Sequence, residues 1–305
     1  MIWRLLSCFV HPASEALTTL TIAEAIRAAA DILARAGIPN ARLDAELLLS
    51  HALNKNRAWL ITHSSDLLDE EQSRRFQASV SRRAKREPVQ YILGTQEFWG
   101  LEFAVTPDVL IPRPETELVV ESALHAAAGN PSPLILDLCT GSGCIAVSLA
   151  KEVPAARVFA ADMSARALAV ARENARRHGV SDRIRFLEGD LFGPFRELDI
   201  RAQADIITAN PPYVRSGDLA ALQAEVRDFE PALALIAGPQ GTEIHQRILG
   251  AAPDFLRKSG TLIMELGQGQ AEELRKIVGE TGQYHSPEIL KDLAGIERVI
   301  VARKT

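Results

Sequence analysis

Cysteine and long apolar runs are both scarce in this sequence of 305 residues. The three cysteines, Cys8, Cys139 and Cys144, are too few and too scattered for a disulfide framework or a zinc site, which favours a reducing compartment. Charged residues interrupt every apolar run before the roughly 18 residues that a membrane-spanning helix requires. The seven histidines stand far apart and show no metal-ligand spacing. We therefore expect neither a disulfide-rich scaffold, nor a membrane protein, nor a metal site.

The net charge of −5, from 34 basic and 39 acidic residues, argues against stable binding of bare nucleic acid. A hydrophobic fraction of 47% and a charged fraction of 24% are ordinary for a globular protein. The chain exceeds the usual size of one domain, which predicts one large and one smaller domain. The apolar run that begins at Leu5 is too short for a secretory signal. We expect residues 1–16 to be an N-terminal extension of a cytoplasmic protein.

Residues 17–87 show the periodicity of a small helical bundle. Thr21 followed by Glu24 is a capping-box pattern that predicts the start of the first helix, and Gly37 predicts its end. The predicted helices cover residues 21–36, 41–53 and 69–87. The leucines that we expect to face the core from the second helix are Leu43, Leu47, Leu48 and Leu49.

Residues 88–114 change to a pattern of strands and turns, which predicts a β-hairpin linker. The strand-like runs are residues 89–93 and 101–105, and turn residues follow at Gly94 and Gly100.

From residue 115 to 305, short apolar runs alternate with helical stretches. This alternation predicts an α/β domain with a parallel sheet and helices on both faces. The predicted strands are centred on residues 134–136, 158–160, 184–186, 206–208 and 261–264. Two further strand-like runs, residues 284–290 and 298–302, have no helix between them, so we expect an antiparallel hairpin at one edge of the sheet.

A glycine turn follows the first strand of this domain. Gly141 and Gly143 allow the backbone to turn sharply and to approach a ligand without an intervening Cβ. With Ala146 they match the G-x-G-x-x-A pattern of dinucleotide-binding proteins, so a nicotinamide-dependent dehydrogenase is one alternative. A strand–helix turn without a ligand is another.

Acidic residues after three successive strands favour a different nucleotide. Asp137, just before the glycine turn, would repel a pyrophosphate but could accept hydrogen bonds from an ammonium group. Asp162 ends the second strand and is placed to accept from two ribose hydroxyls, although it could equally be a helix N-cap. Asp190 and Leu191 follow the third strand, where they would contact an adenine ring unless they form a plain polar turn. Together these positions describe S-adenosylmethionine.

The most specific motif is Asn210-Pro211-Pro212-Tyr213, directly after the fourth strand. The two prolines keep the segment extended and lack N–H groups, so its carbonyls form a rigid row of acceptors beside the Asn210 oxygen. A planar nitrogen with two hydrogens could donate one to Asn210 and one to the Pro211 carbonyl, with Tyr213 stacked on the planar group. These acceptors would also stabilise the positive charge that develops on that nitrogen during methyl transfer.

Taken with this motif, the chain resembles the HemK/PrmC-type peptide chain release factor N(5)-glutamine methyltransferases, which have a class I, Rossmann-like methyltransferase fold. The resemblance extends from about residue 20 to residue 303. It rests on seven ordered blocks, at residues 90–100, 110–117, 137–143, 210–213, 225–231, 264–270 and 292–299.

The resemblance implies that residues 115–305 form the methyltransferase domain. It also implies that S-adenosylmethionine methylates the glutamine in the Gly-Gly-Gln motif of class 1 release factors. The implied cofactor-binding residues are Cys139, Thr140, Gly141, Ser142, Gly143, Asp162, Leu191 and Asn210. The implied substrate-binding residues are Asn210, Pro211, Pro212 and Tyr213, of which Asn210, Pro211 and Tyr213 would be catalytic.

Two positions depart from the family pattern. Cys139 stands where relatives often carry glycine, a change that a negative φ would accommodate. Leu191 stands where some relatives carry an aromatic residue, which weakens one side of the expected adenine pocket. Pro114 with Glu115 and Glu117 has the pattern of a helix start, and we expect no catalytic role for these glutamates.

Two other functions compete with this interpretation. An N6-adenine nucleic-acid methyltransferase would present a similar exocyclic amine to the acceptor motif, but the acidic catalytic half of the chain disfavours it. A non-catalytic binding protein for translation factors would not need an intact glycine turn and acceptor motif. The helical domain carries a basic run that is either a solvated helix face or a docking surface for an acidic partner. Its residues are Arg74, Arg75, Arg82, Arg83, Lys85 and Arg86.

Overall fold

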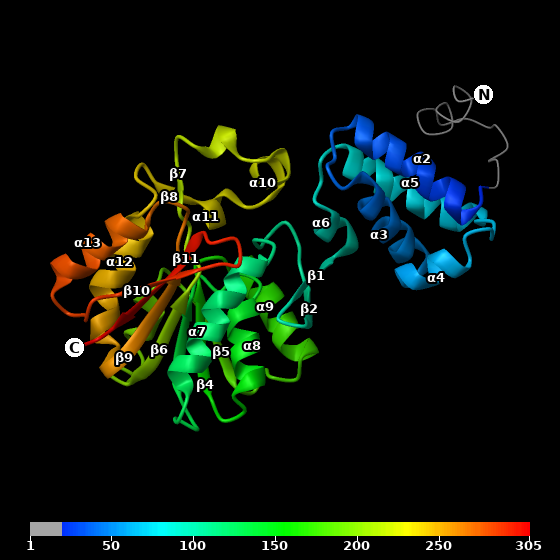
Figure 1. Ribbon diagram of the computed structural model, residues 1–305. Helices are drawn as coiled ribbons and strands as arrows, with labels where there is room; N and C mark the ends of the chain where they lie inside the picture. The colour runs from blue at the N-terminus through cyan, green and yellow to red at the C-terminus, as the bar shows by residue number, and fades with distance from the viewer. Residues whose placement is uncertain (1–19) are drawn as a thin grey trace. The chain divides into compact units, whose positions relative to one another are not determined.

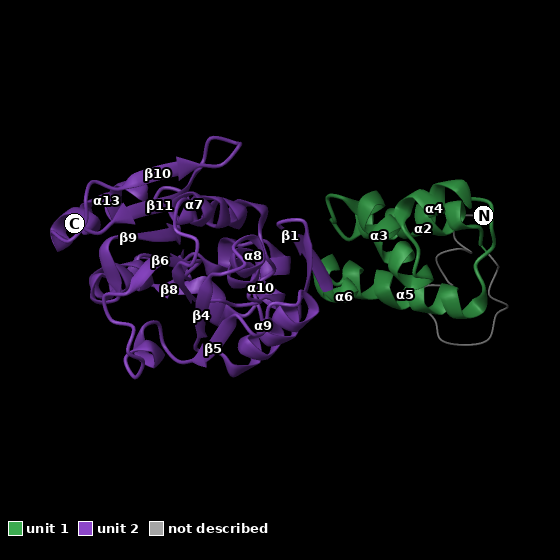
Figure 2. Ribbon diagram, turned by 90° about the horizontal axis from the view of Figure 1, so that it is seen from below, with its two compact units in different colours: residues 1–94 green, residues 95–305 purple. Residues whose placement is uncertain are grey.

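The computed structural model describes residues 20–305, so the extension expected over residues 1–16 lies outside the described part of the chain. Two compact units are present, Met1–Gly94 and Thr95–Thr305 (Figures 1 and 2). Each has its own buried apolar core. Within residues 20–305, no helix is long and apolar enough to cross a membrane and no cluster of potential metal ligands occurs.

The first unit consists of helices, as expected. Thr21 and Glu24 form the predicted capping box at the start of its first helix, and Asp69 with Gln72 forms a second one. Ala29, which is fully buried, lies in the shared core. The helices are α2 (Ile22–Arg35), α3 (Ala41–Leu53), α4 (Arg57–Thr62), α5 (Glu70–Ala84) and α6 (Val89–Leu93).

Two expectations about this unit were wrong, and one helix was missed. Leu43 is exposed, because the inward face of α3 is formed by Leu48, Leu49 and their neighbours. Val89–Leu93 is the helix α6 and not a strand, since a short and mostly apolar segment fits either conformation and here packs into the helical core. The short helix α4, which begins at its N-cap Asn56, was not predicted.

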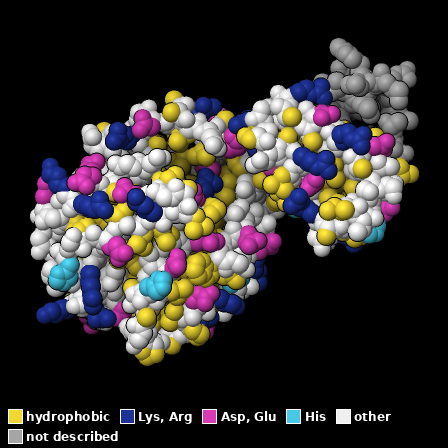
Figure 3. All heavy atoms as spheres, in the orientation of Figure 1, with side chains coloured by type: hydrophobic (Ala, Val, Ile, Leu, Met, Phe, Trp, Pro, Cys, Tyr) yellow, Lys and Arg dark blue, Asp and Glu magenta, His cyan; other side chains and the backbone are white. Residues whose placement is uncertain are grey.

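The basic run of α5 is largely engaged within its own unit. Arg83 forms a buried ion pair with Asp44, with a distance of 2.7 Å between Nε and Oδ2, and Arg82 pairs with Glu87. Arg74 and Arg75 pair with acidic residues of their own helix. On the face drawn in Figure 3, acidic and basic side chains are interspersed. These contacts favour the structural interpretation of the run over a docking role.

The second unit is built on a seven-stranded sheet in the order β10-β11-β9-β6-β3-β4-β5 (Figure 1). The five strands from β9 to β5 in this order are parallel. β11 pairs antiparallel with both β9 and β10, which confirms the predicted edge hairpin. The strands are β3 (Leu134–Leu138), β4 (Arg157–Asp162), β5 (Ile184–Glu188), β6 (Ala204–Ala209), β9 (Leu256–Glu265), β10 (Glu288–Lys291) and β11 (Glu297–Arg303).

Helices cover both faces of this sheet. Alternation along β3 sends Ile135 to one face and Leu136 to the other, and both side chains are fully buried. The first face packs against α7 (Glu117–Ala127), α8 (Cys144–Glu152) and α9 (Ala165–Arg177). The second packs against α12 (Glu243–Ala251) and α13 (Ala271–Thr281). The expected α/β, Rossmann-like class is therefore confirmed.

An antiparallel hairpin, β1 (Thr95–Phe98) and β2 (Leu101–Ala104), precedes the sheet. One buried side chain ties it to the glycine turn. Asn174 on α9 accepts from the Ala104 N–H at 2.7 Å, and its Nδ2 donates to the carbonyls of Ala104 and Ser142 at 3.0 and 2.9 Å. Because a buried backbone group needs a partner, this side chain fixes the hairpin against the turn.

Replacing this side chain should therefore destabilise the second unit. We expect Asn174→Ala to lower its free energy of unfolding by about 2–4 kcal/mol, since each buried backbone group left without a partner costs about 1–3 kcal/mol. Urea unfolding of the full chain measures the change. Glu173→Gln, on the same helix, removes only an exposed ion pair with Arg176 and should unfold at the wild-type urea concentration. Equal midpoints for the two variants would contradict the role of Asn174.

Candidate active site

A cavity of about 330 Å³ opens at the carboxyl ends of the parallel strands, the usual place for a ligand in such a sheet. It is large enough for a small organic ligand. The predicted site residues that line it are Cys139, Thr140, Gly141, Ser142, Asp162, Asp190, Leu191, Asn210 and Pro212. Four predicted residues do not line it, namely Asp137, Gly143, Pro211 and Tyr213.

The turn between β3 and α8 has three left-handed residues. Gly141 and Gly143 have φ of +55° and +80°, and a Cβ on Gly143 would lie 3.1 Å from the Cβ of Ala171. Glycine is therefore required at position 143 both by conformation and by close packing. Cys139 also has a positive φ, +56°. The negative φ that would accommodate a cysteine here is not found, because the backbone must already turn away from the strand at this residue.

Asp137 lies beneath this turn and is fully buried. Its two oxygens accept hydrogen bonds from the hydroxyls of Thr140, at 2.6 Å, and Thr208, at 2.8 Å. Burial raises the pKa of Asp137 to about 7, against the opposing effect of these two hydrogen bonds. A nearby positive charge would favour the ionised form. The carboxyl group is thus suited to a ligand with a cationic group.

Asp162, at the end of β4, connects two loops of the cavity. Its Oδ2 accepts from the Gly141 N–H and its Oδ1 from the Ser164 N–H, each at 2.9 Å. The N-cap of α9 is Ser164, whose hydroxyl accepts from Ala167 N–H, so Asp162 is not the helix cap. Burial is the main cause of a raised pKa at Asp162. Its remaining lone pairs are available to hydroxyl groups of a ligand in the cavity.

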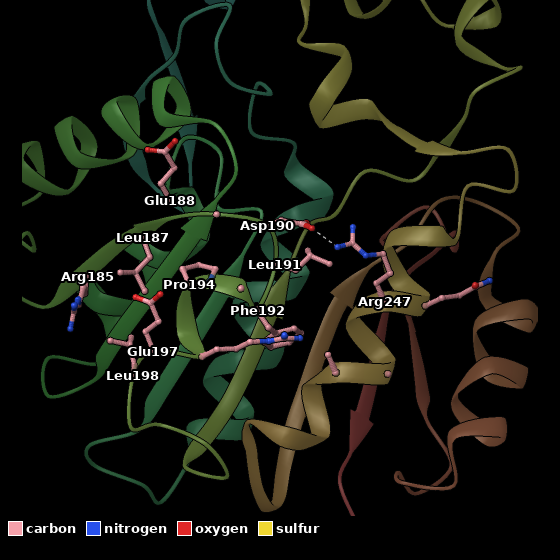
Figure 4. Close-up of a pocket in the computed structure, with 16 residues that line it drawn as sticks. Arg185, Leu187, Glu188, Asp190, Leu191, Phe192, Pro194, Glu197, Leu198 and Arg247 are labelled. Carbon is pink, nitrogen blue, oxygen red and sulfur yellow. Dashed lines mark hydrogen bonds and ion pairs between the residues drawn. The ribbon is translucent and has the colours of Figure 1, made fainter.

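Asp190 and Leu191, which we expect to contact an adenine ring, follow β5. Asp190 forms an ion pair with Arg247 on α12, which was not anticipated (Figure 4). This pair borders both the cavity and an adjacent, more open hollow of about 890 Å³. Leu191 is almost buried and has a φ of +46°, with its side chain against the α12 face of the core. Both residues still line the cavity, at the end of β5.

Asn210 follows β6 and begins a chain of buried polar contacts. Its Nδ2 donates to Thr116 Oγ1 at 3.1 Å, and Thr116 Oγ1 donates to Glu265 Oε2 at 2.5 Å. The Tyr213 hydroxyl donates to the other oxygen of Glu265 at 3.2 Å. Thr116 lies in the 3-10 turn η1 (Pro114–Thr116), and Glu265 ends β9. Three segments distant in sequence therefore meet behind the acceptor motif.

Burial dominates the electrostatics of this chain of contacts. Glu265 is only 2% exposed, and the loss of hydration raises its pKa to about 7. Burial and the neighbouring Glu265 also raise the pKa of Tyr213. The backbone of the motif is held separately, because Gln270 Nε2 donates to the Tyr213 carbonyl at 3.1 Å. The motif is thus fixed at both its side chains and its backbone.

Two segments at the cavity were not given a role from the sequence. Glu230 accepts from the Ile111 N–H at 3.2 Å and forms an ion pair with Arg113. It thereby joins the segment before η1 to the segment that contains Leu233, and both segments line the cavity. Thr116 and Glu265 were missed as well, although both lie in blocks that carried the family resemblance. For Glu265 the available signal was a charged residue between the apolar Met264 and Leu266, whereas Thr116 stands between two glutamates and gave no such signal.

Two family models match the two units of this chain. The methyltransferase small domain matches residues 116–232, and the PrmC N-terminal domain matches residues 24–94. The catalytic domain of hMettl16, solved in complex with MAT2A 3'UTR hairpin 6, aligns with a TM-score of 0.55 at 17% identity. The alignment covers 73% of this chain and 81% of that one, and it supports the fold alone. The chain is a member of the Rossmann-like methyltransferases.

Close relatives give the family. The release factor glutamine methyltransferase of Geobacter sulfurreducens is 46% identical, over 89% of this chain and 92% of that protein. The protein of the same name from Bordetella pertussis is 44% identical, over 88% of this chain and 96% of that protein. The chain belongs to the release factor glutamine methyltransferase family. This confirms the resemblance drawn from the sequence and argues against a dehydrogenase.

The unexpected conformation of Cys139 leads to a stability prediction. A left-handed conformation costs a residue other than glycine about 1–2 kcal/mol. We expect Cys139→Gly to be more stable than Cys139→Ala by about 1 kcal/mol, because both variants lose the thiol but only glycine relieves the strain. Urea unfolding of the two variants measures the difference. A less stable glycine variant would show that the strain at this position is negligible.

Proposed function

We propose that this protein methylates the side-chain amide nitrogen of the glutamine in the Gly-Gly-Gln motif of class 1 release factors, with S-adenosylmethionine as the methyl donor. The observation that carries the proposal is the orientation of Asn210. Its Nδ2 is held by Thr116, and its Oδ1 makes no hydrogen bond within residues 20–305. An acceptor atom beside the two N–H-free prolines suits a planar amide that carries two hydrogens.

The residues at the cavity have the chemistry that S-adenosylmethionine requires. Asp137, whose raised pKa reflects burial, would hold the ammonium group through its charge. Asp162 retains lone pairs for the ribose hydroxyls, and the left-handed turn at Gly141 leaves room for the amino-acid part. The adenine would lie near Leu191, next to the Asp190–Arg247 ion pair. When bound, the cofactor supplies an electrophilic methyl group on a sulfonium.

The protein's own part in the reaction is to hold the accepting nitrogen. Asn210 Oδ1 and the Pro211 carbonyl would each accept one hydrogen of the glutamine amide, which aims its nitrogen at the methyl group. The sulfonium–methyl bond would break as the nitrogen–methyl bond forms, which would leave the thioether S-adenosylhomocysteine, and these oxygens would stabilise the positive charge that develops on nitrogen. The nitrogen would then release one proton to solvent, so none of the motif residues would have to act as a base. Tyr213 would pack on the planar amide.

Within this proposal, residues 17–87 form the domain that docks the release factor, residues 88–114 a linker, and residues 115–305 the catalytic domain. A short loop around one glutamine offers little contact area, so surfaces remote from the cavity would supply the binding energy that positions it. We expect neither a membrane nor a nucleic acid as a stable partner. A cytoplasmic location follows from the proposed substrate, because translation termination takes place there.

The acceptor role of Asn210 can be tested directly. We expect Asn210→Ala to lower kcat by about 10²-fold or more, while the Kd for S-adenosylmethionine changes much less, because one preorganised partner of the reacting nitrogen is lost. Asn130→Ala, at the opposite end of β3, is the matched control and should retain the wild-type kcat.

The assay should offer labelled cofactor with a class 1 release factor and an adenine-containing nucleic acid side by side. Methylation of the nucleic acid alone would replace the proposal by the adenine methyltransferase alternative. Near-normal turnover by Asn210→Ala would refute the acceptor role.

Cofactor binding should depend on pH through Asp137. Its carboxyl group, with a pKa of about 7 in the free protein, must lose its proton to pair with an ammonium group. The affinity for S-adenosylmethionine should therefore fall by up to about tenfold for each pH unit below 7. Calorimetry in buffers of different ionisation enthalpy measures both the affinity and the proton released at pH 6. Asp137→Asn should bind weakly and release no proton. Unchanged proton release by that variant would assign the titration to another group, with Asp162 the first candidate.

A further inference from the structure

The hydrogen bonds that connect Asn210, Thr116 and Glu265 can run in only one donor-to-acceptor direction. A threonine hydroxyl has one hydrogen, and Thr116 gives it to Glu265 Oε2. Tyr213 gives its only hydroxyl hydrogen to Glu265 Oε1. Both oxygens of Glu265 are therefore acceptors, which only the ionised carboxylate provides without competition. The Thr116 oxygen is left to accept, so the Asn210 amide must turn its NH₂ group toward it.

This direction decides what Asn210 offers to the cavity. With the NH₂ group directed at Thr116, the carbonyl oxygen is the free end of the amide. If the Thr116 hydroxyl instead donated to Asn210, the amide would turn over and present its NH₂ group to the substrate. Two donor groups would then face each other, and a glutamine amide nitrogen could not bind in the required position.

We propose that Glu265, acting through Thr116, is a positioning residue that fixes the direction of the Asn210 amide and so makes the site selective for a nitrogen that donates. The proposal deepens the function proposed above and rests on it. Glu265 would not contact the substrate. Its hold on the Tyr213 hydroxyl would fix the ring of the same motif from the other side.

The surroundings of Glu265 make its charge sensitive to pH. Thr116 and Glu115 face it from η1, Tyr213 from the motif after β6, and Arg298 from β11. Arg298 is itself paired with Glu115 and Asp292.

From α12, the ring of His245 contacts the backbone carbonyl of Glu265, with 2.8 Å between Nε2 and the oxygen. Burial lowers the pKa of His245 to about 4, so it is neutral near pH 7. Since the pKa of Glu265 is about 7, its carboxyl group gains a proton as the pH falls below this value, and its two oxygens are then no longer both free to accept hydrogen bonds.

The first experiment follows the side-chain amide of Asn210 by NMR, without cofactor or substrate and in an Asp137→Asn background, because Asp137 titrates in the same pH range as Glu265. In this background, the ¹⁵N–¹H signals of Asn210 should shift with pH about a midpoint near 7, as Glu265 titrates. Addition of Glu265→Gln or of Thr116→Val should abolish this shift. An Asn210 amide that ignores pH in the Asp137→Asn protein, or still titrates when Glu265→Gln is added, would overturn the proposal whatever the substrate proves to be.

The second experiment measures turnover at saturating S-adenosylmethionine, where the bound ammonium group keeps Asp137 ionised. We expect Thr116→Val to lower kcat by about tenfold or more, with the Kd of the cofactor within about twofold of wild type, since the loss of an oriented partner acts on the reacting nitrogen. Thr116→Ser keeps the hydroxyl and should restore most of the rate. Thr281→Val, which removes a hydroxyl bonded to Val278 on α13, is the matched control.

The pH profile completes the test. The kcat of the wild type should fall below pH 7, and Glu265→Gln should give a lower and flatter profile. Equal kcat for Thr116→Val and the wild type would overturn the positioning role. A pH-sensitive Asn210 amide in a protein that methylates no release factor would refute the proposed function while leaving the directing role of Glu265 intact.

Discussion

Two carboxyl groups buried without a cation of their own determine the arrangement of this site. In the sheet, β6 lies between β3, which carries Asp137, and β9, which ends at Glu265. The hydrogen bonds to both carboxyl groups come from hydroxyl groups, and neither forms an ion pair within residues 20–305. Burying a carboxylate in this way is unfavourable. A positive charge near Asp137 and ordered hydrogen-bond donors around Glu265 would therefore stabilise the site. Asn210 follows β6, the strand between the two.

The loops around these groups are held by single side chains that each bond to several partners. Asp162 joins the glycine turn to the start of α9, and Asn174 joins the same turn to the hairpin. Glu230 joins two segments of the cavity wall, and Gln270 holds the backbone of the acceptor motif. Removal of one such side chain would leave several polar groups unpaired at once, so each of them contributes to the rigidity of the cavity wall.

Much of the fold could be predicted because its signals are local. In the sequence, the parallel strands appear as short apolar runs and the capping box as Thr21 followed by Glu24. The glycine turn appears as the spacing of Gly141 and Gly143. The roles of Thr116 and Glu265 were missed because 149 residues separate them and only the closed sheet brings them together. The left-handed φ of Cys139 and the helix at Val89–Leu93 depend on tertiary packing that overrides residue preference. The positions of the predicted site residues followed from strand order, but their partners did not.

Two of the three tryptophans, Trp59 and Trp99, lie in different units, so each gives a separate fluorescence signal for its own unit. Trp59 stacks on His63 within the helical unit, with 3.9 Å between ring centroids. Trp99 lies on the hairpin of the other unit, where its Nε1 donates to Glu152 at 2.9 Å. Asn174 couples that hairpin to the glycine turn. The emission of Trp99 should therefore respond to movements of the glycine turn, while that of Trp59 reports on the helical unit alone.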